Sequence, residues 1–253
     1  MTPQQIDLVK ATVPVLRESG VALTTYFYQR MLKHHPELKN TFNMDHQETG
    51  RQPRALAAAV LAYADNIENP ALLAKAVERI TTKHVSLNIQ PEQYAIVGEN
   101  LLHSISEVLN VPMDSDLIAA WKAAYTQLAE LLIGVEQAKY TALNNENGGW
   151  TGWREFEITA IESLDAAQLF TLKAKDNSAI KTAKAGEFIS VRVKLADQDL
   201  YQPQQFTFEA DQAEHYQIVV KAEENPTAFS VHHALLQHYK IGDLVEVSAP
   251  SAL

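Results

Sequence analysis

The sequence predicts two domains, an all-α domain followed by an antiparallel β-barrel with one helix. Up to about Leu143, apolar residues recur at intervals of three and four, which is the helical period. The segment 144–149 is polar and ends in paired glycines, as turns and linkers do. Beyond it, apolar and polar residues alternate, which is the period of a strand. We therefore expect one domain over residues 1–145 and a second over 146–253.

The first helix has the clearest start signal. Thr2 and Gln5 form a capping box, and Pro3 suits the first helical position, so this helix is expected to run to about Glu18 and to end at Gly20. The later helices are placed by their apolar faces and by proline or polar starts. They are expected over 21–33, from near 53, over 70–85, over 91–109 and from a cap at 114 or 115 to about 140, with a bent connector over 36–44.

Alternating apolar residues predict the strands of the second domain. They are expected around 156–160, 189–195, 206–208, 216–220 and 244–247, with one helix over 229–238. An antiparallel barrel with one helix is the simplest packing of these elements, and it completes the predicted fold class.

Composition excludes several classes of function. The chain has 253 residues, of which 46% are hydrophobic, and its net charge of −10 argues against nucleic-acid or anionic-membrane partners. The absence of cysteine excludes disulfides, thiolate metal sites, iron–sulfur clusters and a cysteine nucleophile. The segment 1–7 lacks the features of a signal peptide, and no apolar run is long enough to span a bilayer. We expect a cytoplasmic protein with no membrane span.

His84 is the first candidate functional residue. It continues the apolar series Leu73, Val77 and Ile80 at helical spacing, so its imidazole is expected on the face that turns toward the core. A buried imidazole needs a partner for each ring nitrogen. A metal or haem iron is one such partner, and a backbone carbonyl in an ordinary core is the other.

Six stretches of the helical half, in order and without large gaps, match one known family. They are 9–14, 27–28, 36–44, 63–69, 83–84 and 91–98. On these stretches the first half resembles the globin domain of bacterial flavohaemoglobins, and the resemblance implies a haem b cofactor.

The resemblance implies roles for residues on both sides of the haem. His84 would be the proximal ligand of the iron, with Lys83 beside it in the haem-binding set. Glu136 matches the carboxylate that accepts a hydrogen bond from the proximal histidine, and Tyr94 matches the tyrosine of the same network; a carboxylate there raises ligand basicity. Read alone, Glu136 is equally an ordinary solvated helix residue.

On the distal side the resemblance points to Tyr28 and Phe42. Phe42 matches the aromatic that packs against the porphyrin. Tyr28 matches the distal tyrosine, whose phenol can donate a hydrogen bond to O2 held in the pocket, and Leu56 and Val60 would line the pocket with apolar groups. Gln52 falls at the family's distal glutamine, but Pro53 follows it. Because a residue before proline is pushed away from helical geometry, we expect Gln52 at the helix cap.

The second half resembles the FAD-binding domain of flavohaemoglobins and ferredoxin reductases. The matching stretches are 150–156, 185–188 and 241–250. The family's flavin signature is Arg-x-Tyr-Ser, and the matching residues here are Gln204, Phe206 and Thr207, with Phe188 where the family usually has tyrosine. An amide cannot neutralise a phosphate as a guanidinium does. Together with the glycine-free stretch 225–230, these changes predict a degenerate site for which FAD is an unlikely cofactor.

Two classes of function follow from the resemblance. The first is a nitric oxide dioxygenase in which O2 and NO react at the haem. Because neither FAD nor an NAD-binding domain is expected, its electrons are expected from a separate reductase. The second is a non-enzymatic sensor or store of O2 or NO that uses the barrel to dock a partner. A lipid or other hydrophobic ligand in the distal pocket is a further expectation from the family.

Overall fold

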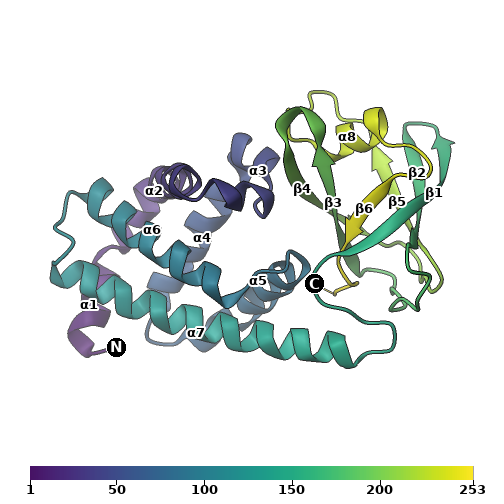
Figure 1. Ribbon diagram of the computed structural model, residues 1–253. Coiled ribbons are helices and arrows are strands. Elements are labelled where there is room, and N and C mark those ends of the chain that lie inside the picture. Colours follow the sequence, from purple (N-terminus) through teal and green to yellow (C-terminus); the bar gives the residue numbers. More distant parts are fainter. Residues whose placement is uncertain (253) are drawn as a thin grey trace. The chain divides into compact units, whose positions relative to one another are not determined.

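The computed structural model describes residues 1–252, so Leu253, the last residue of the predicted second domain, lies outside the described part. Helices form the N-terminal part of the chain and strands form the C-terminal part, as Figure 1 shows. The helices are α1 (Pro3–Ala11), α2 (Val13–His34), α3 (Met44–Glu48), α4 (Arg51–Asp65), α5 (Ala74–Ser86), α6 (Pro91–Leu109) and α7 (Asp116–Asn145), with the 3-10 turns η1 (Pro36–Asn40) and η2 (Pro70–Leu73) between them.

The first two helices divide earlier than the sequence predicts. The predicted capping box of Thr2 and Gln5 is present, but α1 ends at Ala11 and α2 begins at Val13. Proline suits the first turn of a helix because its missing N–H would have no partner there, and Pro14 occupies that turn of α2. The expectation that Gly20 ends a helix is wrong. Gly20 lies inside α2, where a Cβ atom would lie 3.6 Å from the Cβ of Ala57 on α4, so this glycine lies at a close contact between helices.

Two compact units account for the chain. One comprises Met1–Leu38, His46–Ile80 and Gln90–Val135, and the other comprises Lys39–Asp45, Thr81–Ile89 and Glu136–Leu253. The divisions after Ile80 and Val135 fall inside α5 and α7, whereas the sequence places a boundary between residues 145 and 146. That boundary stays a prediction.

The core of the first unit lies between α2, α4 and α6. Helix α2 packs on both of the others, and its inward residues Phe27 and Met31 are at most 1% exposed. Tyr125 of α7 crosses α6 at Gly98, where a Cβ atom would lie 2.4 Å from the ring. Only glycine fits at this crossing. The phenol of Tyr125 then donates a hydrogen bond of 2.6 Å to the carbonyl of Tyr94.

The second unit contains a six-stranded antiparallel sheet. Its strands are β1 (Arg154–Leu164), β2 (Ala167–Ala174), β3 (Phe188–Leu195), β4 (Leu200–Thr207), β5 (Tyr216–Lys221) and β6 (Leu244–Val247), in the order β4-β3-β6-β1-β2-β5. The sheet is open, with β4 and β5 at its ends, rather than the closed barrel that was expected. Helix α8 (Val231–His238) packs on β3, β4 and β5. A helical domain followed by an antiparallel sheet with one helix is confirmed; β2 was missing from the predicted strands.

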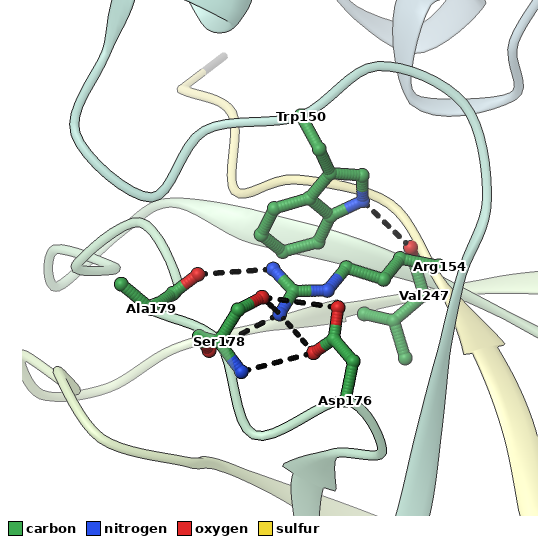
Figure 2. Close-up of polar contacts among 6 residues, drawn as sticks. All are labelled: Trp150, Arg154, Asp176, Ser178, Ala179 and Val247. Carbon is green, nitrogen blue, oxygen red and sulfur yellow. Dashed lines mark hydrogen bonds and ion pairs between the residues drawn. The ribbon is translucent and has the colours of Figure 1, made fainter.

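Arg154, the first residue of β1, is hydrogen-bonded to the turn that follows β2 (Figure 2). Its guanidinium contacts Asp176 at 2.6 Å and donates to the carbonyls of Ser178 and Ala179 at 3.1 and 3.0 Å. The same group lies 5.2 Å from the centroid of the Trp150 ring, whose indole N–H donates to the carbonyl of Val247. These contacts join the start of β1 to residues 176–179, which follow β2.

Within residues 1–252, no helix is both long enough and apolar enough to cross a bilayer.

Candidate functional site

His84 and Glu136 form the best-defined polar pair among the candidate residues. Nδ1 of His84, in the last turn of α5, lies 2.8 Å from Oε1 of Glu136 on α7. The side chain of Glu136 is 4% exposed and that of His84 is 31% exposed. The structure therefore excludes the solvated-residue interpretation of Glu136. A carboxylate at Nδ1 fixes the orientation and tautomer of the ring, and it directs Nε2 toward any ligand that the imidazole binds.

The ends of α5 and α7 are held together around this pair. Lys139, three residues after Glu136, donates to the hydroxyl of Thr82 at 3.0 Å. Tyr140 donates to the carbonyl of Ile89 at 2.7 Å. Residues three and four apart share one face of a helix, so Glu136, Lys139 and Tyr140 meet the end of α5 together. These contacts fix the position of the carboxylate relative to His84, and the sequence had indicated no role for Lys139 or for the hydroxyl of Thr82.

Tyr28 and Gln52 form a second pair, between α2 and α4. Tyr28 is 6% exposed, and its phenol is hydrogen-bonded to Gln52. Burial raises the pKa of Tyr28 far above its ordinary value, and the bond from Gln52 only partly opposes this. Oε1 of Gln52 is buried and has no hydrogen-bond partner among the described residues, which leaves the amide N–H as the group that donates to Tyr28.

The expectation that Gln52 lies at a helix cap is wrong. The cap of α4 is Gly50, in the left-handed conformation at φ 68°, and Gln52 lies inside the first turn. The first four N–H groups of a helix have no intrahelical partner, so Pro53 loses no helical hydrogen bond there. Leu56 and Val60 follow Gln52 at intervals of four residues on the same face of α4. Leu56 is half-buried and Val60 is 8% exposed.

The remaining predicted haem residues lie on three other segments. Phe42 is half-buried in the connection between η1 and α3, and Lys83 is half-buried on α5. Tyr94 is 8% exposed on α6. The roles of Phe42, Lys83 and Tyr94 stay predictions.

The predicted flavin positions gather on β3 and β4. Phe188 pairs in register with Thr207, and it is 1% exposed. Gln204 is half-buried, while Phe206 is 5% exposed and its ring lies 5.2 Å from that of His232 on α8. Beside them, Nε2 of Gln205 is buried and has no partner among the described residues. This stretch therefore presents a buried donor that a ligand group could satisfy.

The helical core and the antiparallel sheet define a class of protein, a globin-type domain joined to a sheet of the flavin-domain type. The globin family profile matches residues 25–132. The flavohaemoprotein of Chromobacterium violaceum is 44% identical over 256 residues, which cover 99% of this chain. The helical part of the chain belongs to the globin family, and the chain as a whole is similar to flavohaemoproteins over nearly its full length.

Solved structures give the same assignment. The flavohaemoglobin of Malassezia yamatoensis, solved with bound FAD and haem, is 27% identical with a TM-score of 0.86 and covers 100% of this chain and 64% of its own. A bacterial globin from Campylobacter jejuni is 41% identical with a TM-score of 0.53, and the match covers 55% of this chain and 99% of that protein. The chain spans about 63% of the length of the flavohaemoprotein that it matches.

These relatives correct the expectation that FAD is unlikely. The sequence matches are named flavohaemoproteins, and the structure that covers the whole chain holds FAD. The expectation rested on the side chains changed at Phe188, Gln204 and Phe206 and on the glycine-free stretch 225–230. Backbone N–H groups and the shape of a folded surface also hold anionic cofactors, and the fold that supplies them is retained. The separate reductase, which was inferred from the loss of flavin, therefore has no support from the relatives.

Proposed function

We propose that the chain is a haem-b globin that converts NO and O2 to nitrate, and that its β-domain holds FAD. The observation that carries this proposal is the buried Glu136 carboxylate 2.8 Å from Nδ1 of His84. The haem supplies an iron at which O2 is activated. The reaction takes up one electron for each NO and O2 converted to nitrate.

The chain's own residues suit these tasks. His84 would ligate the iron through Nε2, and Glu136 would hold the ring and raise its basicity. Tyr28 is a buried neutral phenol that would donate a hydrogen bond to bound O2, with Gln52 holding its oxygen. Leu56 and Val60 would keep water out of the distal side, and Phe42 would pack on the porphyrin.

The β-domain gives FAD a partial but workable set of contacts. The amide of Gln204 stands at the place of the signature guanidinium, and on the other face of β4 the N–H of Gln205 has no partner among the described residues. Hydrogen bonds from neutral amides are weaker than those from a charged group, so FAD would bind less tightly than with the full signature. FAD held there supports electron delivery within one chain.

The absorbance spectrum of the purified full chain, loaded with haemin and FAD, tests the cofactors. We expect a Soret band and flavin bands in equal amounts, a Soret band lost in His84→Ala, and a Soret band retained in His103→Ala, a histidine of α6. A haemin complex that His84→Ala leaves unchanged would contradict the haem assignment, and a flavin removed by gel filtration would contradict the FAD assignment.

Consumption of NO in air tests the reaction. With excess reductant, we expect many equivalents of NO to become nitrate for each haem. Consumption that stops after one equivalent, although the haem is re-reduced, would contradict the dioxygenase and leave the O2 or NO sensor as the better function.

A further inference from the structure

A short segment of the helical half, residues Lys39–Asp45, folds against strand β4. The contacts that join them are hydrogen bonds between residues about 160 positions apart in the sequence. They run from Tyr201 N to Asn40 Oδ1 at 2.8 Å, from Gln202 Nε2 to Lys39 O at 2.7 Å, from Met44 N to Gln202 Oε1 at 2.7 Å and from Asn43 Nδ2 to Pro203 O at 2.7 Å. We call Lys39–Asp45 the bridging segment.

Gln202 is the centre of this contact. Gln202 is fully buried, at 0% exposure. Its side-chain Nε2 donates to the carbonyl of Lys39, and its Oε1 accepts from the N–H of Met44. A buried amide that is satisfied in this way specifies one position of its partner, since any shift leaves two polar groups without hydrogen bonds. Gln202 therefore fixes the bridging segment at both of its ends.

The strand that receives the segment is the edge of the sheet. Strand β4 has β3 on one side only, and it contains Pro203, a residue that sheets tolerate at edges. Exposed N–H and C=O groups on an edge strand need cover. Asn40 and Asn43 supply it through their side chains. These hydrogen bonds give Asn40 and Asn43 a structural role in the connection between η1 and α3.

The same contacts reach the residues that match the flavin signature. Nδ2 of Asn43 also lies 3.4 Å from Oε1 of Gln204, the residue at the place of the signature arginine. Asp45 accepts a hydrogen bond of 2.8 Å from Thr227, in the stretch that matches the phosphate turn. Phe42, the residue that matches the haem-packing aromatic, lies between these anchors. The bridging segment thus contains Phe42 and is hydrogen-bonded both to Gln204 and to the stretch that matches the phosphate turn.

We propose that Gln202 and Asn43 are positioning residues that hold Phe42 through the bridging segment, so that flavin on β4 changes ligand binding at the haem. The proposal rests on the haem and FAD assignments made above. Coupling between two bound groups is reciprocal. The bridging segment would carry it, because its hydrogen bonds join Phe42 to the strand that holds the signature positions.

The first experiment needs no cofactor. Amide hydrogen exchange is measured on the full chain for wild type, Gln202→Met and Asn43→Ala, with the surface variants Gln137→Met and Asn144→Ala on α7 as matched controls. We expect the amide of Met44 to exchange about 2- to 10-fold faster in Gln202→Met, the change that the loss of one hydrogen bond predicts. Asn43→Ala should accelerate exchange across the bridging segment. Wild-type rates in both variants would overturn the positioning role, and a Gln202→Met that fails to fold leaves Asn43→Ala to decide.

The second experiment measures coupling. The CO dissociation rate of the haemin-loaded, reduced chain is recorded without FAD and with saturating FAD. We expect the two rates to differ at least about 5-fold in wild type and in both controls, and to become equal in Asn43→Ala. If wild type binds both cofactors but releases CO at the same rate with and without FAD, the coupling is overturned and the proposed function still stands. Failure of haem or FAD to bind at all would overturn the proposed function, and with it the coupling, while the exchange data still decide the positioning role.

Discussion

Nδ1 of His84 and Oε1 of Glu136 lie 2.8 Å apart, although 52 positions of sequence separate them. The carboxylate belongs to α7 and is almost fully buried, so it has lost most of its water. A buried carboxylate needs a donor, and the imidazole N–H supplies it. The pair thereby fixes which nitrogen of His84 faces a metal.

Replacing Glu136 by glutamine tests that pair with little change of shape. Because a neutral amide accepts a weaker hydrogen bond than a carboxylate, His84 should become a poorer donor to iron. We expect a lower iron–histidine stretching frequency and a roughly 10- to 100-fold loss of haem affinity or NO turnover. The control is Glu130→Gln, an exposed carboxylate on the same helix. An unchanged stretching frequency in Glu136→Gln would show that the carboxylate does not affect the iron–histidine bond.

Replacing Tyr28 by phenylalanine removes only the phenol hydroxyl. Hydrogen bonds to charged acceptors contribute about 1.5–3 kcal/mol, so O2 should dissociate about 10- to 100-fold faster. Stopped-flow release of O2 measures the rate. Tyr63→Phe is the matched control, because Tyr63 is also buried but donates to the carbonyl of Ala124. A rate that rises equally in both variants would contradict the role of Tyr28.

The O2 dissociation rate should also be insensitive to alkaline pH. Burial raises the pKa of Tyr28 far above the ordinary tyrosine value of 10.0, so the phenol keeps its donor proton while exposed tyrosines ionise. We expect a flat rate in wild type from pH 7 to about pH 10. Acceleration centred on the ordinary tyrosine pKa, and absent from Tyr28→Phe, would show that the phenol is not held in a buried site.

Gln52 is predicted to act through Tyr28. In Gln52→Leu the phenol loses the amide that holds its oxygen, and the O2 dissociation rate should rise by less than in Tyr28→Phe. Two residues in contact give non-additive effects, so the double variant should resemble Tyr28→Phe alone. If the two rate changes instead multiply, Gln52 and Tyr28 act independently.

The contact of Arg154 with Asp176 predicts a pH-dependent stability. The guanidinium beside Asp176 lowers the pKa of that carboxyl from 3.8 to about 2. A lowered pKa stabilises the fold above the unfolded value, and the contribution is lost as the pH falls through about 2. Asp176→Asn should therefore melt about 1–3 °C lower than wild type at pH 7, and this difference should shrink below pH 4. Thermal unfolding followed by circular dichroism checks this, with Asp165→Asn in the β1–β2 turn as the control. A difference that is the same at pH 2 and pH 7 would contradict the ion-pair explanation.

Local signals predicted the helices well and the turns less well. The start of α6 at Pro91 and its end at Leu109 follow the sequence pattern, and Ser115 caps α7 as expected, with its hydroxyl accepting from the N–H of Ile118. The prediction was wrong where a local rule was applied too strictly. Gly20 stays helical because one glycine inside a helix costs only about 1 kcal/mol, and Gln52 stays helical because the first turn of a helix tolerates proline.

The candidate site was predictable in its residue types but not in its contacts. Helical spacing placed His84 on an inward face, and the family resemblance supplied Glu136 and Tyr28. Nothing local indicated Gln202, because an amide in a strand has the same pattern whether it faces solvent or a second segment. The FAD expectation was wrong for a related reason, since it judged the site from a few short stretches, whereas the whole folded domain contributes to a cofactor surface.

By itself, the sequence determined the two fold classes and the absence of cysteine chemistry, and it predicted a histidine on the inner face of a helix at position 84. These follow from periodicity and composition, which are properties of neighbouring residues. The tertiary structure alone decided that Glu136 is buried beside His84, that Gln52 holds Tyr28, and that residues 39–45 cover the edge of β4. Each of these joins residues 24 or more positions apart in the chain. Packing fixes such contacts because burial obliges polar groups to find partners wherever the fold brings them together.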